Sequence, residues 1–185
     1  MTKSKQHIQS ICTAIILLAS LPACQATTMK QAEGIGYREA RFAEVAAVRK
    51  WQSCHDDAIE LDSQARRGGD PAKYLASANL LVHCEAELGS DAASAAKDAR
   101  LRSYALAVQN YIKAGDISAA RDSLQKLRKG FPKQDLYLAD GASFIDSMEV
   151  LTGAISRDSI HEFPMRNISK ELKQELRRIR YWKSH

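Results

Sequence analysis

Residues 51–88 read WQSCHDDAIELDSQARRGGDPAKYLASANLLVHCEAEL, and this pattern predicts two helices joined by a tight turn. The wider stretch 36–66 contains no proline and is rich in Ala, Glu and Arg, which favours one long helix. The turn is indicated by Gly68-Gly69-Asp70-Pro71, since Gly suits the position after a helix while Asp and Pro suit the start of the next. A second helix is expected from about residue 71 to residue 88.

Each of these two predicted helices carries a stripe of mainly apolar residues at spacings of three and four, the pattern of a packed helix face. On the first helix the stripe comprises Ala47, Trp51, Cys54, Ala58, Leu61 and Ala65. On the second helix it comprises Tyr74, Ala78, Leu81, Cys84 and Leu88. We expect the two stripes to face each other in an antiparallel pair.

A disulfide is predicted between Cys54 and Cys84. The two residues are equally far from Gly69 in the sequence, so a chain that folds back at Gly69 places them opposite each other. A disulfide needs Cα atoms roughly 5.5 Å apart, which facing positions provide. Two buried free thiols are the alternative. His55 and His83 face each other by the same rule, but adjacent helical side chains point about 100° apart, so a zinc site is not favoured and no metal is expected.

A second helical hairpin is predicted after residue 90. Ser90-Asp91 can cap a helix from about 92 to 114, Gly115-Asp116 breaks the chain, and a further helix runs to about 129 before Phe131-Pro132. The residues expected to pack these two helices together are Tyr104, Ala107, Val108, Tyr111, Gly115, Ala120, Leu124, Leu127 and Pro132.

The window Leu101–Gln134 has the 34-residue period of the tetratricopeptide repeat and resembles that repeat at its packing positions. It departs from the family at Val108 and Leu127, where Gly and Ala are usual, and windows displaced by one period match poorly. A generic helical bundle is therefore the alternative. The resemblance implies an all-α fold, with antiparallel helical hairpins stacked as a short solenoid. Its groove would be lined by first-helix residues, with the candidates Tyr104, Gln109, Asn110 and Lys113.

A fifth helix is expected over residues 134–152, followed by a loop that ends near Phe163-Pro164. Residues 166–185 hold seven Lys or Arg and two Glu, a net charge of +5 that equals the net charge of the whole chain. Apolar residues recur there on one arc, which predicts a basic amphipathic C-terminal helix. Its basic residues include Lys170, Lys173, Arg177, Arg178, Arg180 and Lys183.

Three roles are open for this basic helix. It can cap the end of the helical stack, as solenoids require for solubility. It can lie on an anionic membrane surface. It can also contact an acidic protein partner. Nucleic acid is not an expected partner, because residues 1–23 have the features of a secretory leader, which would export the chain from the cytosol.

Residues 1–23 have the features of a secretory leader: Lys3 and Lys5 are followed by the short apolar run ICTAIILLASL at residues 11–21. Leu21-Pro22-Ala23-Cys24 resembles the lipobox of bacterial lipoproteins. The resemblance implies that Cys24 is acylated as the first mature residue, and Gln25 implies sorting to the outer membrane, on its periplasmic side. Ordinary cleavage after Ala23 or Ala26, giving a soluble periplasmic protein, is the alternative. Residues 24–35 would then form a flexible tether.

The chain has 185 residues, 45% of them hydrophobic and 26% charged, which fits one globular domain. We expect a helical domain over residues 36–153, and a loop with the basic helix over residues 154–185. The sequence has no phosphate-binding loop and no HExxH or GxSxG motif. We therefore nominate no catalytic residue and no cofactor, and expect a protein that is not an enzyme.

The lipobox and the repeat together resemble small tetratricopeptide lipoproteins that assist the assembly of envelope machines, including the pilotins of type IV pili and secretion systems. This resemblance implies a lipid-anchored module that binds an envelope protein or peptide. Two alternatives are a peptidoglycan-associated enzyme or enzyme activator, and a structural homo-oligomer.

Overall fold

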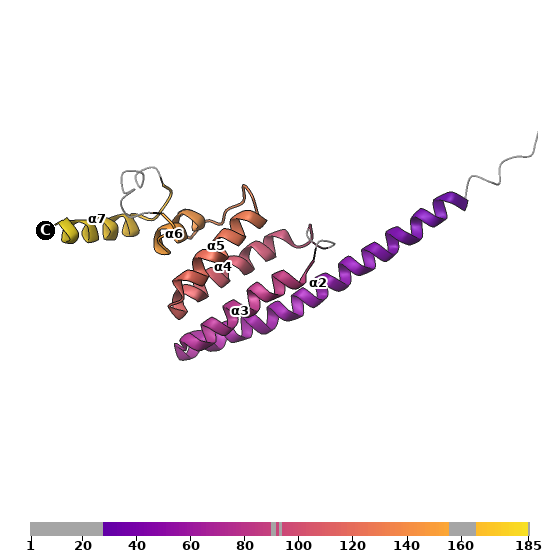
Figure 1. Cartoon of the computed structure of the whole chain (residues 1–185), viewed down its shortest axis with the longest axis horizontal. Coiled ribbons are helices and arrows are strands. Elements are labelled where there is room, and N and C mark those ends of the chain that lie inside the picture. The colour runs from indigo at the N-terminus through magenta and orange to yellow at the C-terminus, as the bar shows by residue number, and fades with distance from the viewer. Residues whose placement is uncertain (1–27, 90–91, 93, 156–165, 185) are drawn as a thin grey trace, which may run out of the picture. The chain divides into compact units, whose positions relative to one another are not determined.

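The computed structural model describes residues 28–89, 92, 94–155 and 166–184. Within these ranges the chain forms six α-helices and one isolated β-bridge, so the expected all-α class is found (Figure 1). The helices are α2 (Thr28–Gly68), α3 (Pro71–Glu87), α4 (Lys97–Ala114), α5 (Ile117–Gly130), α6 (Phe144–Leu151) and α7 (Lys170–Ser184). The chain divides into two compact units, residues 1–42 and 43–185, and the packing of α3 to α7 belongs to the second.

The turn between α2 and α3 forms as its residues predict. Gly69 has a φ of +64°, a left-handed conformation that glycine adopts without strain. The Asp70 carboxylate caps α3 by accepting hydrogen bonds from the backbone N–H groups of Ala72 at 2.9 Å and Lys73 at 3.4 Å. Pro71 occupies the start of the helix, where no N–H group is needed. These contacts fix where α2 ends and α3 begins.

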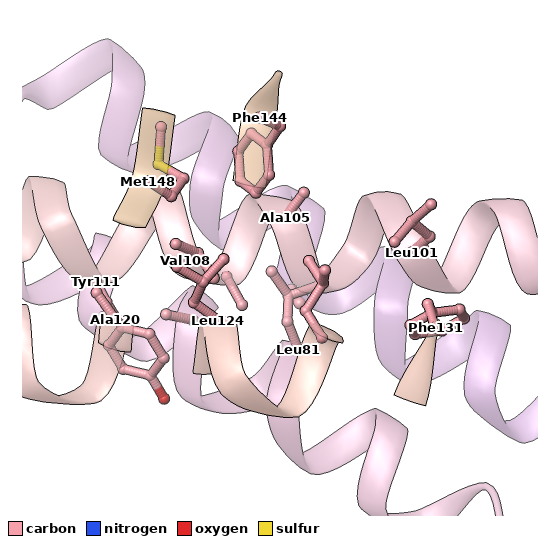
Figure 2. Packing of buried hydrophobic residues seen from close by; sticks show 14 residues of the cluster. Leu81, Leu101, Ala105, Val108, Tyr111, Ala120, Leu124, Phe131, Phe144 and Met148 are labelled. Carbon is pink, nitrogen blue, oxygen red and sulfur yellow. The ribbon is translucent and has the colours of Figure 1, made fainter. Parts of the chain in front are cut away.

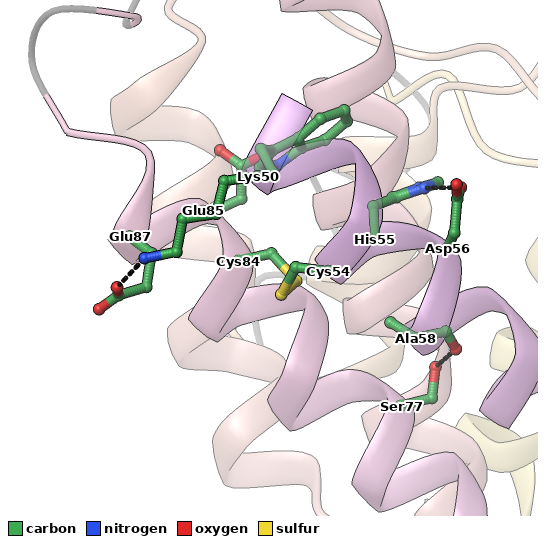
Figure 3. Close-up of a disulfide and its surroundings, with 10 residues drawn as sticks. Lys50, Cys54, His55, Asp56, Ala58, Ser77, Cys84, Glu85 and Glu87 are labelled. Carbon is green, nitrogen blue, oxygen red and sulfur yellow. Dashed lines mark hydrogen bonds and ion pairs between the residues drawn. A yellow bond between two sulfur atoms is a disulfide. The ribbon is translucent and has the colours of Figure 1, made fainter. Parts of the chain in front are cut away.

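The predicted stripes pack α2 against α3 within the second unit. Trp51 is buried with Cys84 and Leu88, and Ala58 and Ala78 belong to the main core. A disulfide joins Cys54 to Cys84, with a Cα–Cα distance of 5.7 Å, which confirms the predicted pairing (Figure 3).

Helix α2 begins earlier than expected, at Thr28. Residues 28–35, expected as part of a flexible tether, are therefore helical. Their sequence is TMKQAEGI, which contains the good helix formers Met, Lys, Gln, Ala and Glu. Helix propensity accounts for the observed conformation of these residues.

The main hydrophobic core is formed mainly by α3, α4, α5 and α6, and Ala58 of α2 also belongs to it (Figure 2). Helix α4 contacts both α3 and α5. The predicted packing residues that are buried in this core are Ala107, Val108, Tyr111, Ala120, Leu124 and Leu127. Tyr104 is half-buried, Pro132 is exposed, and Gly115 ends α4 in a left-handed conformation at a φ of +84°. Small side chains such as Ala107 and Ala120 let the helices approach closely.

Helix α4 begins at Lys97 rather than near residue 92. Ala92 is fully buried in the cluster around Trp51 and Leu88, so the chain is fixed against the first hairpin before α4 can start. Ala96 then has a φ of +48°, a left-handed conformation that interrupts any helix continuing from residue 92. Ser90 and Asp91, the expected cap, lie outside the described residues.

The expectation of a helix over residues 134–152 is wrong for its first half. Helix α6 covers only Phe144–Leu151, and the preceding residues form a turn with a β-bridge between Tyr137 and Ser143. The Asp135 carboxylate accepts hydrogen bonds from the backbone N–H groups of Leu136 and Ile145, and the Ser143 hydroxyl caps α6 by accepting one from Asp146 N–H. Asp and Ser side chains thus bond the backbone locally and compete with helix formation.

Residues 166–168 attach the C-terminal helix to α6. Arg166 Nη1 lies 3.1 Å from Asp146 Oδ1 and 2.7 Å from Glu149 Oε2. The backbone N–H of Ser143 donates to the carbonyl of Asn167 at 2.6 Å. Ile168 is buried against Val150, with Ile155, Leu172 and Leu176 packed around them. The first half of α7 is therefore part of the folded structure.

Candidate functional site

Two hollows flank residues 133–137, which lead from α5 toward α6 and are named here the connecting ridge. The larger hollow has a volume of about 640 Å³ and the smaller one about 480 Å³. The larger is also lined by Arg128 of α5 and Asp146 of α6, and the smaller by Asp98 and Arg102 of α4. Both hollows are lined by Lys133, Gln134, Asp135 and Tyr137.

The connecting ridge is held by bonds from its own residues. Asp135 Oδ1 accepts hydrogen bonds from Leu136 N–H at 2.7 Å and Ile145 N–H at 3.2 Å, while Oδ2 accepts one from the Ser143 hydroxyl. Lys133 has a φ of +66°, a conformation that costs free energy for a residue with a Cβ atom. Lys133 lines both hollows, so this strained position is part of the site.

Phe131 fixes the start of the ridge to the core. Its ring lies edge-on to Tyr104, with 6.0 Å between the ring centroids, and the Arg100 guanidinium carbon is 5.6 Å from the Phe131 centroid. Burial raises the pKa of the Tyr104 hydroxyl above its ordinary value. Tyr104 thus supports the ridge through Phe131 and does not line either hollow.

The exposed groups around the hollows are chemically mixed. Tyr137 is 70% exposed, and the cations of Lys133 and Arg102 lie near the carboxylate of Asp98 around the smaller hollow. An aromatic ring beside groups of both charges can stack, donate and accept hydrogen bonds, and pair with charges on a polypeptide. This arrangement is suited to binding a polar peptide segment or a protein loop.

The four candidate groove residues have different environments in the structure. Asn110 is fully buried, and its Nδ2 donates to Ser77 Oγ at 3.2 Å, so its role is to join α4 to α3 inside the core. Lys113 is exposed, with its Nζ 4.8 Å from the centroid of the Tyr74 ring, and Gln109 is half-buried. Neither hollow is lined by Tyr104, Gln109, Asn110 or Lys113.

Sequence reasoning missed the ridge because residues 134–143 were assigned to a helix. The available signal was their composition, since Asp135, Asp140 and Gly141 are turn-forming residues close together. The hollows themselves arise from contacts between segments distant in sequence, such as the hydrogen bond from Asn167 N–H to Asp146 Oδ2 at 2.9 Å.

A buried polar network lies beside the disulfide and connects three helices. Trp51 Nε1 of α2 donates to Glu85 Oε1 of α3 at 2.7 Å, and Arg100 Nε of α4 donates to Glu85 Oε2 at 3.0 Å. Burial raises the pKa of the Glu85 carboxyl, although Arg100 acts in the opposite direction. On the same hairpin, Ser77 Oγ donates to the Ala58 carbonyl at 2.8 Å (Figure 3).

The two histidines next to the disulfide do not form a metal site with it. His55 Nδ1 lies 3.6 Å from Asp56 Oδ1 (Figure 3). The His55 ring stacks on the Trp51 ring, with 5.1 Å between the ring centroids, and His83 is exposed. No cluster of three or more His, Cys, Asp or Glu side chains suited to a metal ion occurs among the described residues.

The basic C-terminal residues occupy α7, as the sequence predicts. Arg178 Nε donates to Glu175 Oε2 at 2.9 Å, and Lys173 is half-buried. The remaining predicted basic residues with described side chains are exposed, namely Lys170, Arg177 and Arg180. The side chain of Lys183 and the whole of Cys24 lie outside the described residues.

Comparisons of the chain with protein-family models, curated proteins and solved structures give no match. Among the helices of the described residues, none combines the length and the apolar character needed to cross a membrane.

Proposed function

We propose that this chain is a lipid-anchored protein of the bacterial periplasm that binds other envelope proteins and assists the assembly of a pilus or secretion system. Cys24 carries the lipid in this proposal, and it holds the protein at the outer membrane. The helical unit of residues 43–155 faces the periplasm and presents the connecting ridge to a partner.

The Cys54–Cys84 disulfide is the observation that carries this proposal. It links two helices in a chain whose leader resembles that of a lipoprotein. Stable structural disulfides belong to oxidising compartments such as the periplasm and are rare in the cytosol. The leader in the sequence and the disulfide in the structure are independent features, and both are consistent with the periplasm.

The hairpin of α4 and α5 supports a tetratricopeptide-like role. Its helices are separated by Gly115 and by Asp116, whose carboxylate accepts a hydrogen bond from Ala119 N–H at 2.9 Å. Ala120 packs in the core between the helices, at the position where the repeat uses a small residue. In this reading α2–α3 and α4–α5 are successive units of a short solenoid, and repeats of this kind commonly bind peptides.

A capture experiment with a ridge variant tests the proposed binding role. Tyr137→Ala removes the exposed aromatic ring of the ridge. Leu151→Ala is the control, because it removes another exposed large hydrophobic side chain that lines neither hollow. We expect envelope extracts to yield the same partner with the wild type and Leu151→Ala, and much less of it with Tyr137→Ala. Equal recovery by both variants would remove the ridge from the proposal.

Two other results would favour the alternative functions. Recovery of the chain alone, together with a larger particle in light scattering, favours a structural homo-oligomer. Hydrolysis of peptidoglycan by the purified chain, lost on changing one acidic residue, favours the enzyme.

A further inference from the structure

The apolar arc of α7 is packed at its start and exposed at its end. Leu172 and Leu176 pack around Val150 and Ile168, as described above. The same face of the helix continues through Ile179 and Trp182, which lie three and six residues after Leu176. These two side chains are 37% and 70% exposed. The C-terminal half of α7 is amphipathic, and its apolar face is thus exposed.

The positive charge of the chain is concentrated on this same segment. Residues 166–185 carry a net charge of +5, so the remainder of the chain is balanced. Of the two glutamates in the segment, Glu175 is paired with Arg178 at 2.9 Å. Arg177 and Arg180 follow on the polar side of the helix and are exposed. A surplus of cations therefore lies on the polar side of the same helix half.

Aromatic residues complete the pattern at the end of α7. Tyr181 and Trp182 meet edge-to-face, with 5.6 Å between ring centroids, and both are more than half exposed. Tyr and Trp are enriched where a protein meets the boundary between lipid and water, because their rings are apolar and their polar groups remain hydrated. Arg side chains can lie along apolar surface while keeping their charge in water.

We propose that residues 177–184 of α7 lie on the surface of an anionic phospholipid bilayer, with Trp182 at the level of the headgroups. Ile179 and Trp182 enter the lipid boundary, and Arg177 and Arg180 bind lipid phosphates. This inference rests on the proposed function and deepens it, because it gives the protein a second contact with the membrane that its lipid anchor already holds. A short exposed apolar arc, with a surplus of cations on the polar face of the same helix, suits an anionic lipid surface better than the shaped pocket of an acidic protein.

Trp182 itself provides the readout, since Trp51 is the only other tryptophan and is buried. The full chain with Cys24→Ser, which has no acyl group, is mixed with vesicles of phosphatidylglycerol and phosphatidylcholine that carry brominated acyl chains. The brominated lipids quench the fluorescence of a tryptophan that reaches the acyl chains. Any quenching that disappears in Trp182→Phe is therefore quenching of Trp182. We expect this quenching with the anionic vesicles and not with phosphatidylcholine alone, and we expect added salt to weaken it.

Two charge variants sharpen the test. Arg177→Glu with Arg180→Glu should weaken vesicle binding by roughly thirtyfold or more, since each basic residue near an anionic surface contributes measurably to binding. Lys126→Glu with Lys129→Glu changes the net charge equally at exposed positions of α5 and should leave Trp182 quenching unchanged. Equal loss in both variants would overturn the proposal, because it would show only an effect of net charge.

The same assay separates lipid from protein as the ligand. Absence of Trp182 quenching by anionic vesicles, combined with a Trp182 emission shift on adding polyglutamate, would overturn the lipid assignment in favour of an acidic protein. The result does not depend on acylation, because the chain used has no Cys24 thiol. Fatty-acid labelling of the wild-type chain tests acylation separately.

Discussion

The disulfide and Glu85 are the two features of the first hairpin with the clearest consequences for stability. Cys54 and Cys84 are separated by 30 residues, so their bond removes a large loop from the conformational freedom of the unfolded chain. We expect the double variant Cys54→Ser, Cys84→Ser to lose about 3–4 kcal/mol of unfolding free energy. Denaturant unfolding with and without reductant measures this loss.

Reduced wild-type protein should then unfold at about the same denaturant concentration as the double serine variant. A wild type that is equally stable with and without reductant would contradict a stabilising role for the bond. Peptide mapping without reduction should also recover a fragment in which Cys54 is joined to Cys84.

Glu85 makes the stability of the protein depend on pH. Burial raises the folded-state pKa of this carboxyl above its unfolded value, so the folded state binds the proton more tightly. Its contribution is therefore fully present below the unfolded pKa and is lost as pH rises through the raised pKa. Glu85→Gln removes this titration, so its stability relative to wild type should increase between mildly acidic and neutral pH.

Glu87→Gln is the matched control on the same helix. The hydrogen bond from Lys50 lowers the pKa of Glu87, so this exposed carboxylate contributes stability above its unfolded pKa that is lost on acidification. Its variant should thus change relative to wild type in the opposite direction with pH. Denaturant unfolding over a pH series compares the two, and the same trend in both would contradict the account of Glu85.

The residues of the first hairpin could be predicted because each has one dominant physical preference. Gly69, Asp70 and Pro71 each suit one place in a turn, and Cys54 and Cys84 share a stripe and a distance from that turn. Asn110 could not be assigned in this way. An amide suits an exposed groove or a buried hydrogen bond equally, and the choice here depends on Ser77 from another helix.

At the scale of helices, α7 has two halves with different roles. Deleting residues 177–185 removes mainly exposed side chains, so the thermal midpoint should stay nearly unchanged. Deleting residues 166–185 removes the contact between Ile168 and Val150 and the ion pair between Arg166 and Glu149. We expect this longer deletion to cost about 2–4 kcal/mol.

Thermal unfolding followed by circular dichroism compares the two deletions. Equal midpoints for the wild type and the longer deletion would show that α7 does not stabilise the fold. A large drop for the shorter deletion would show that its end packs on the fold, contrary to the exposure of Trp182.

Helices with a continuous apolar stripe could be predicted from sequence, whereas the segment before α6 could not. Leu138, Ala142 and Ile145 have helical spacing, yet residues 134–143 are not helical. The hydrogen bonds of Asp135 and Ser143 to nearby backbone decide the local conformation. Spacing alone does not reveal this competition between side chain and backbone.

At the scale of the whole molecule, charge and predicted lipid attachment occur at opposite ends of the sequence. The proposed acylation at Cys24 and the basic segment of residues 166–185 would both act at a membrane, while the connecting ridge would bind the partner. The helical class followed from the sequence, but the hollows beside the ridge depend on long-range contacts such as that of Asn167 with Asp146. Such contacts have no local signature.

Export and acylation are the central claim of this account, and the intact mass of the protein isolated from its native cells tests them directly. We expect a chain in the envelope fraction that begins at a fatty-acylated Cys24, with Cys54 and Cys84 oxidised. A full-length chain in the cytosol that begins at Met1, carries no acyl group and has both thiols reduced would contradict the account.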